Sequence, residues 1–556
     1  MYMSDAIHRM YNLDDYDEDE VSDCEDCFDQ SCQCQLTSQS DGTSVSAFTD
    51  TLQETSDKEL YQELPFYPYE TGEPLEDSTF ELLLDGQIIE KSANDGFFGF
   101  HHITIVTSSA KNLSKLFQLT MGFEEIASKT LETGSRSIAA HVIRNGDIVI
   151  EFVNTLNPPP NNPSMLPQPY QKLIDTNLRY EELKADVQSH LHDSIGRLFQ
   201  RHLYNSNETF EILHKDIEGF TDRAFDEFYS TTVTSIEDKI DLYELSEYLK
   251  NHGEGIIDIS FKVKSVDKIF QRAVKFGANV LKYPKISVDQ YGSVKMATIV
   301  IPGTDIRHTL IENIDYVGNY LPHYSNEFFP KIGFNSIDLS AIDHCVENYS
   351  WKQMSFHARL YAEIFGFRKF WSVDEKDIST DKSSLRSTVM ASSNGKIRIP
   401  INEPSKGAFK SQIEEFYDYN CGPGVQHMAL RTDNIIETVR KMKRNGVSFN
   451  NAPENYYERL ANRMKQCHAS IYEDFEQIKE LGILIDFDEE SCGPNRKCNY
   501  ILQIFTHPLN DRPTLFIEII QRHHHNGFGK GTFKGLFETI EHQQRLRGNL
   551  VPSDRS

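Results

Sequence analysis

The chain has 556 residues and a formal net charge of −28, and this length is too great for one hydrophobic core, so at least two compact units are expected. Most of the charge is local, because residues 1–95 contain 25 Asp or Glu against three basic residues, a net of −22, leaving −6 for the other 461. The remaining surface offers no basic stripe for phosphates, which argues against nucleic acid as a partner.

No apolar run reaches the roughly 18 residues that cross a bilayer, so no membrane span is expected. The N-terminus lacks the basic start and apolar centre of a signal peptide, which favours a cytoplasmic location. Five of the nine cysteines are dispersed through the body of the chain, and free thiols in a reducing compartment explain them better than a disulfide framework. They are Cys345, Cys421, Cys467, Cys492 and Cys498.

Residues 1–95 form an acidic extension with little apolar periodicity, as in YNLDDYDEDEVSDCEDC. Such a segment cannot bury enough surface to offset its ordering entropy, so it is predicted to be mostly disordered. Its four other cysteines, Cys24, Cys27, Cys32 and Cys34, have a spacing that could bind zinc. The alternative is a flexible tail that happens to contain cysteines.

From Phe100 the sequence alternates short β-rich runs with amphipathic helical patterns, and it repeats. HHITIVTSSAKNLSKLFQLTMGF, from His101, matches DHCVENYSWKQMSFHARLYAEIFGF, from Asp343, and GIIDISFKVKSVDKIFQRAVKFG, from Gly255, matches GVQHMALRTDNIIETVRKMKRNG, from Gly424. Each segment is predicted as a strand, a helix that ends at Gly, and further strands. Four βαβββ modules in two tandem pairs, an α+β fold, are therefore expected.

The predicted domains are residues 96–320 and 335–556. A Pro-rich and then helical stretch at about 160–247 interrupts the first domain, and we interpret it as an inserted helical segment.

The repeat also shows how the two halves differ. His344 aligns with His102, His427 with Asp258, and Glu518 with Glu312. Only the second half offers two imidazoles and a carboxylate on separate strands, a set that leaves adjacent positions open on an octahedral iron(II). The first half is interpreted as a scaffold without a complete metal site, a weak metal site there being the alternative. His523, His524 and His525 are discounted, because adjacent strand residues point to opposite faces.

The motifs DHCVEN, FWSVDE, SSLRS, PINEP, KSQIEEF, GPGVQHMAL, YILQIFT, DRPTLFIEIIQR, GFGKGTF and LRGN resemble the 4-hydroxyphenylpyruvate dioxygenase family of the vicinal oxygen chelate superfamily. The resemblance runs from about Gly96 to Leu550. It implies two open-barrel domains, the second one catalytic with a C-terminal helix that closes the pocket, and a homodimer. It also implies one Fe(II) per chain, held by His344, His427 and Glu518.

The resemblance further implies an oxidoreductase that converts 4-hydroxyphenylpyruvate and O2 to homogentisate and CO2, in tyrosine and phenylalanine catabolism. The family's polar catalytic residues correspond to Gln426, Asn402, Gln412 and Gln503. Its substrate-binding residues correspond to Ser387, Phe505, Phe516, Phe528 and Phe533. Two alternatives are an enzyme like hydroxymandelate synthase, which oxidises the benzylic carbon, and a non-catalytic scaffold or interaction protein.

Overall fold

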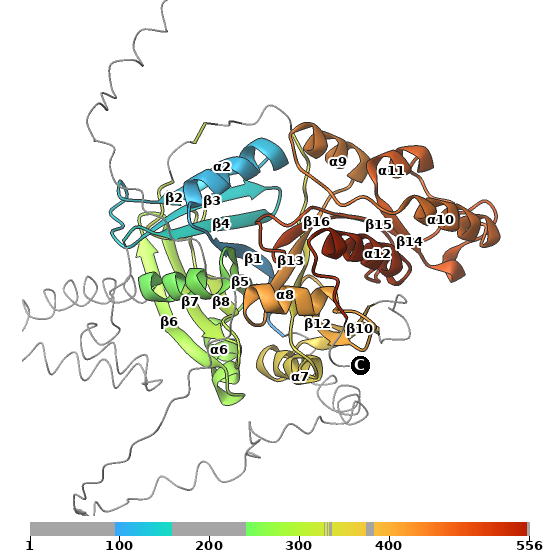
Figure 1. Cartoon of the computed structure of the whole chain (residues 1–556). Helices are drawn as coiled ribbons and strands as arrows, with labels where there is room; N and C mark the ends of the chain where they lie inside the picture. Colours follow the sequence, from blue (N-terminus) through green and yellow to red (C-terminus); the bar gives the residue numbers. More distant parts are fainter. Residues whose placement is uncertain are drawn as a thin grey trace, which may run out of the picture. The chain divides into compact units, whose positions relative to one another are not determined.

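Two mixed β-sheets flanked by helices make up the described part of the chain (Figure 1). In this computed structural model, residues 95–157, 241–326, 329–330, 332, 336–373 and 383–552 are described. The predictions for residues 1–94, with the zinc alternative at Cys24, Cys27, Cys32 and Cys34, and for residues 160–240 of the insertion lie outside the described residues. Residues 241–252 are helical.

The first sheet has eight strands in the order β2-β3-β4-β1-β5-β8-β7-β6. Its strands are β1 (Phe97–Val106), β2 (Glu124–Lys129), β3 (Ile138–Asn145), β4 (Ile148–Thr155), β5 (Gly255–Val263), β6 (Asn279–Asp289), β7 (Gly292–Val300) and β8 (Arg307–Asn313). Helix α2 (Ala110–Met121) follows β1, and helix α6 (Val266–Lys275) follows β5.

The second sheet also has eight strands, in the order β10-β11-β12-β9-β13-β16-β15-β14. Its strands are β9 (Ile342–Asn348), β10 (Arg368–Val373), β11 (Ser384–Ala391), β12 (Arg398–Ser405), β13 (Gly424–Arg431), β14 (Leu484–Phe487), β15 (Tyr500–Phe505) and β16 (Phe516–His523). Its helices are α7 (Met354–Phe365), α8 (Gln412–Asn420), α9 (Ile435–Arg444), α10 (Glu454–Gln466), α11 (Phe475–Leu481) and α12 (Lys530–Leu546), with a short 3-10 turn, η3 (Glu489–Ser491).

The two sheets have the same strand order, each strand of the second lying eight places after its counterpart. In each half the first strand pairs parallel with the fourth, and the fifth pairs parallel with the eighth. The first and fifth strands then pair antiparallel and join two βαβββ modules into one sheet. This arrangement confirms the predicted α+β fold of tandem modules.

Helices α6 and α9 bury the same pattern of positions, as their aligned sequences predict. Helix α6 buries Val266, Ile269, Phe270 and Ala273, and α9 buries Ile435, Thr438, Val439 and Met442. This i, i+3, i+4, i+7 spacing places one apolar stripe against the sheet. Both helices therefore cover the sheet of their own half.

The Gly-Phe turns after α2 and α7 need glycine for its backbone. Gly122 and Gly366 have φ of 74° and 75°, the left-handed region that ends many helices. A Cβ on Gly122 would lie 2.9 Å from the Cβ of Ile337. These turns confirm the predicted helix ends.

One alignment between the halves is wrong: Glu312 does not correspond to Glu518. Strand pairing places Arg307 beside Asp258, and Phe516 beside His427. Counting from these pairs, Thr309 occupies the place of Glu518, three residues from the predicted partner. A shift by an odd number of residues turns side chains to the other face of the sheet.

Glu312 instead corresponds to Gln521, and both side chains cap a helix. Glu312 accepts a hydrogen bond from the backbone N–H of Val266 at 2.9 Å, and Gln521 Oε1 accepts one from the N–H of Ile435 at 2.7 Å. These residues begin α6 and α9, so each side chain satisfies an N–H that a helix start leaves without a backbone partner.

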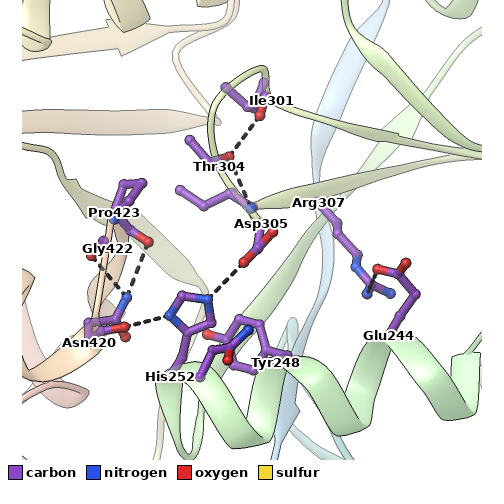
Figure 2. A network of polar contacts seen from close by, with 12 residues as sticks. Glu244, Tyr248, His252, Ile301, Thr304, Asp305, Arg307, Asn420, Gly422 and Pro423 are labelled. Carbon is purple, nitrogen blue, oxygen red and sulfur yellow. Dashed lines mark hydrogen bonds and ion pairs between the residues drawn. The ribbon is translucent and has the colours of Figure 1, made fainter. Parts of the chain in front are cut away.

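His252 connects the first half to the second (Figure 2). Its Nδ1 lies 2.5 Å from the backbone oxygen of Asn420, at the end of α8, and its Nε2 lies 2.8 Å from an Asp305 carboxylate oxygen. Both partners are acceptors, so both ring nitrogens donate and the ring is an imidazolium. The residue thus ties the end of α8 to the first half.

The structure also bears on the membrane and disulfide predictions. Among the described helices, none combines the length and apolar composition that a membrane crossing needs. The five cysteines of the described region are free thiols, Cys492 and Cys498 included.

Candidate metal centre

Three adjacent strands bring the predicted ligands together. His344 lies on β9, His427 on β13 and Glu518 on β16, and Ala429 of β13 is the pairing partner of both His344 and Glu518. Glu518 Oε2 lies 3.2 Å from His344 Nε2 and 3.2 Å from His427 Nε2. Within the part of the chain that the structure describes, these residues form the one group of three suited to hold a metal ion, with ligand atoms within 4.8 Å of one another.

The remaining polar atoms of the three side chains have partners. His344 Nδ1 lies 2.8 Å from Asp343 Oδ1, and His427 Nδ1 lies 3.0 Å from Gln426 Oε1. Gln503 donates to Glu518 Oε1 at 2.8 Å. Partners of this kind fix the ring tautomers and leave two Nε2 atoms and one carboxylate oxygen facing a common point, as a divalent cation requires.

Charge in this group is balanced between the acid and the imidazoles. Burial opposes ionisation of Glu518, but His344 and His427 outweigh it and lower the pKa of Glu518 to about 2. Burial also lowers the pKa of His427, and Glu518 does not fully offset this. Burial lowers the pKa of His344 too, but Glu518 and Asp343 outweigh it and the net shift is upward, so a cation must displace a proton from His344. With that exchange, two imidazole nitrogens and an ionised carboxylate are donors that suit a divalent cation.

A cavity of about 50 Å³ lies beside the three ligands. Of the nine predicted pocket residues, eight line it: Ser387, Asn402, Gln412, Gln426, Gln503, Phe505, Phe516 and Phe528. The ninth, Phe533, is in α12, but its side chain lies outside the described residues. This volume is small beside the several hundred Å³ of a typical ligand pocket.

Aromatic rings surround the histidines. The Phe516 ring stacks on His427 at 4.7 Å, and Phe505 meets the same imidazole edge-on at 6.0 Å. Phe528 contacts the His344 ring edge-on at 5.1 Å. These rings give the polar group a largely apolar surround.

The predicted site did not include the apolar residues that line the cavity: Val346, Trp371, Leu385, Val389 and Pro400. Four of them were accessible from strand alternation, because they lie two positions from a predicted site residue on the same strand, as Val346 does from His344. Trp371 lies on β10, from which the sequence analysis predicted no site residue.

The aligned positions of the first half form hydrogen bonds among themselves instead. Asp258 accepts from Ser260 at 2.7 Å and from the Thr309 hydroxyl at 2.5 Å, and His102 Nε2 lies 3.1 Å from Ser260 Oγ. The described residues contain no second group suited to a metal. The three adjacent histidines also separate, His523 contacting Glu473 and His525 contacting Asp488.

Residues 341–465 match the family model described as the Glyoxalase/Bleomycin resistance protein/Dioxygenase superfamily. The paired sheets and the converging ligands therefore define a protein of this superfamily. A solved mutant of 4-hydroxymandelate synthase from Streptomyces coelicolor is similar in fold, with a TM-score of 0.57, 22% identity and coverage of 81% of this chain and 99% of that chain.

Curated relatives give the narrower family. The chain is 38% identical over 460 residues to 4-hydroxyphenylpyruvate dioxygenase of Yarrowia lipolytica, covering 82% of this chain and 94% of the relative. It is 36% identical over 468 residues to that of Danio rerio, covering 83% and 94%. The chain belongs to the 4-hydroxyphenylpyruvate dioxygenase family, and it is a dioxygenase of the oxidoreductase class, which excludes the non-catalytic alternative.

Proposed function

We propose that this chain converts 4-hydroxyphenylpyruvate and O2 to homogentisate and CO2, with one Fe(II) held by His344, His427 and Glu518. The observation that carries the proposal is the convergence of these three buried side chains on one point inside a pocket lined by amides and phenylalanines. Bound by two imidazoles and a carboxylate, iron supplies dioxygen activation and oxidative decarboxylation of a chelating 2-oxo acid.

The protein's own side chains position the reactants. Gln503 holds one oxygen of Glu518 and Gln426 faces Nδ1 of His427, so both ligands stay oriented. Phe505, Phe516 and Phe528 line the cavity and provide apolar surface for an aromatic ring while excluding water.

Polar groups lie on the neighbouring elements β11, β12 and α8. Ser387 and Asn402 are paired across β11 and β12, and Gln412 begins α8. Hydroxyl and amide groups both donate and accept hydrogen bonds. We assign to them recognition of the phenol hydroxyl, and to Phe533 a place against the ring.

Iron content and product identity test the proposal together. The wild-type protein is expected to bind one Fe(II) per chain and to release homogentisate and CO2 from 4-hydroxyphenylpyruvate under oxygen, measured by mass spectrometry. His344→Ala should lose both iron and turnover, and the matched variant of exposed His542, His542→Ala, should lose neither. Full activity in His344→Ala would refute the ligand assignment, and 4-hydroxymandelate as product would replace ring hydroxylation by benzylic hydroxylation.

We also propose the domain division of 1–95, 96–320 and 335–556, a homodimer and a cytoplasmic location. The repeated strand order supports the two domains, and the five free thiols suit a reducing compartment. Size-exclusion chromatography with light scattering tests the dimer, and a single-chain mass would refute it.

A further inference from the structure

Arg522 lies on the metal-ligand strand β16, and its side chain is only 6% exposed. Its Nε donates to Asp343 Oδ2 at 2.8 Å and its Nη2 donates to Asp343 Oδ1 at 2.7 Å. Strand β13 separates the two strands in the sheet, so this bidentate pair links β16 to β9 across it. Paired hydrogen bonds of this kind are both strong and specific in geometry.

A β-bulge brings Asp343 to the metal ligand next to it in sequence. Ala429 pairs with His344 and the following residue, Leu430, pairs with Ile342, so Asp343 is the extra residue of β9. Adjacent residues of a regular strand point to opposite faces, and a bulge removes that restriction. Asp343 Oδ1 therefore accepts from Arg522 and also lies 2.8 Å from His344 Nδ1.

The same guanidinium reaches the segment that leads into α12. Residues 525–529, which we call the closing turn, connect the end of β16 to this helix. Arg522 Nη1 donates to the backbone oxygens of His525 at 3.1 Å and Gly527 at 2.5 Å. Its Cζ lies 5.1 Å from the centre of the Phe528 ring, a cation–π contact.

The Phe528 ring contacts both Arg522 and His344. Arg522, Asp343, His344 and Phe528 therefore form a ring of contacts in which each residue touches the next. Phe528 also lines the cavity, whose volume of about 50 Å³ is small beside the several hundred Å³ of a typical ligand pocket. Opening the pocket at Phe528 moves the closing turn away from Arg522. It therefore disturbs a residue that holds Asp343, which in turn orients His344.

We propose that Asp343 and Arg522 are positioning residues that couple metal binding at His344 to closure of the pocket by the closing turn. The inference rests on the proposed function only in taking His344 as a metal ligand. Coupling between two sites is reciprocal, so bound metal stabilises the closed turn and the closed turn strengthens metal binding.

The matched variants are Arg522→Lys and Arg463→Lys. The first retains the positive charge and loses the paired hydrogen bonds to Asp343 and the contacts with the closing turn. Arg463, on α10, makes similar contacts away from the cavity: it pairs with Asp486 and Glu489 and covers the Phe487 ring at 4.2 Å. Arg463→Lys therefore shows how replacing an arginine with such contacts affects Fe(II) binding and hydrogen exchange when the arginine lies away from the cavity.

Two measurements without substrate test the coupling. Anaerobic titration of the full-length metal-free protein with Fe(II) gives the affinity, and hydrogen exchange of peptides covering 524–546, with and without Fe(II), reports the closing turn and α12. Wild type and Arg463→Lys should show slower exchange when Fe(II) is bound. Arg522→Lys should bind Fe(II) about 10–100-fold more weakly and should lose most of this metal-dependent protection at saturating Fe(II).

Wild-type affinity and protection in Arg522→Lys would overturn the proposal. Weaker binding with full protection would also overturn it, because Arg522 would then act on the ligand alone. Should the variant not fold, the wild type decides: exchange over 524–546 that is indifferent to Fe(II) excludes coupling. A different product from 4-hydroxyphenylpyruvate would refute the proposed function and leave this result unchanged.

Discussion

Replacing His252 should weaken the contact between the two halves in a way that depends on pH. The imidazolium donates to the Asn420 carbonyl and to Asp305, and the residue is 5% exposed. A hydrogen bond from a charged group contributes about 1.5–3 kcal/mol. The Asp305 side chain is 62% exposed, so its ion pair adds only about 0–1 kcal/mol. His252→Gln should therefore cost about 1.5–4 kcal/mol at slightly acid pH.

The direction of the pH dependence follows from the two pKa shifts. Burial lowers the pKa of His252, but Asp305 and the Asn420 carbonyl outweigh it, so the net shift is upward from 6.5. Its stabilisation is fully present below pH 6.5 and is lost as pH rises through the raised pKa. The hydrogen bond from His252 lowers the pKa of Asp305. The stabilisation contributed by the ionised Asp305 carboxylate is therefore present above its ordinary pKa of 3.8 and is lost as pH falls through the lowered pKa.

Urea unfolding of wild type and His252→Gln between pH 5.5 and 9 measures this effect. The difference in unfolding free energy should be largest at the acid end and should shrink as pH rises. His542→Gln, at an exposed position on α12, is the control and should show no such trend. A difference that stays constant or grows with pH would refute the imidazolium assignment.

Three other substitutions test separate parts of the structure. Glu312→Ala should cost about 1 kcal/mol of stability through loss of the α6 cap and leave metal content unchanged. Loss of metal would show that Glu312 is a metal ligand, as its rejected alignment with Glu518 implied. Gln503→Leu should weaken Fe(II) binding about 10-fold or more, because Glu518 loses an orienting partner, and equal affinity in anaerobic titration would contradict this. Phe516→Ala should destabilise the fold by about 3–5 kcal/mol, measured by chemical denaturation, and a loss below 1 kcal/mol would show that Phe516 does not pack as a core residue.

Much of the fold was predictable because its signals are local or repeated. The apolar spacing of α6 and α9 and the glycines after α2 and α7 each indicate an element by themselves. The repeat then indicated the tandem modules, and the contrast of His427 with Asp258 indicated that the metal site lies in the second half.

What failed depends on strand pairing. The alignment of Glu312 with Glu518 set the last strands of the two halves in the wrong register, because sequence similarity in short apolar strands does not determine which backbone groups pair. The bulge at Asp343 was unpredictable for the same reason, since an extra residue is defined only against its partner strand. Asp343 therefore looked like an ordinary neighbour of His344.

The order of strands in the second sheet determines which module supplies each metal ligand. His344 belongs to the module that begins with β9, whereas His427 and Glu518 belong to the module that begins with β13. A solitary βαβββ unit of this type could offer at most two of the three groups. The centre therefore requires two modules side by side, and in the first half the corresponding positions hold Asp258 and Thr309, which hydrogen-bond to each other.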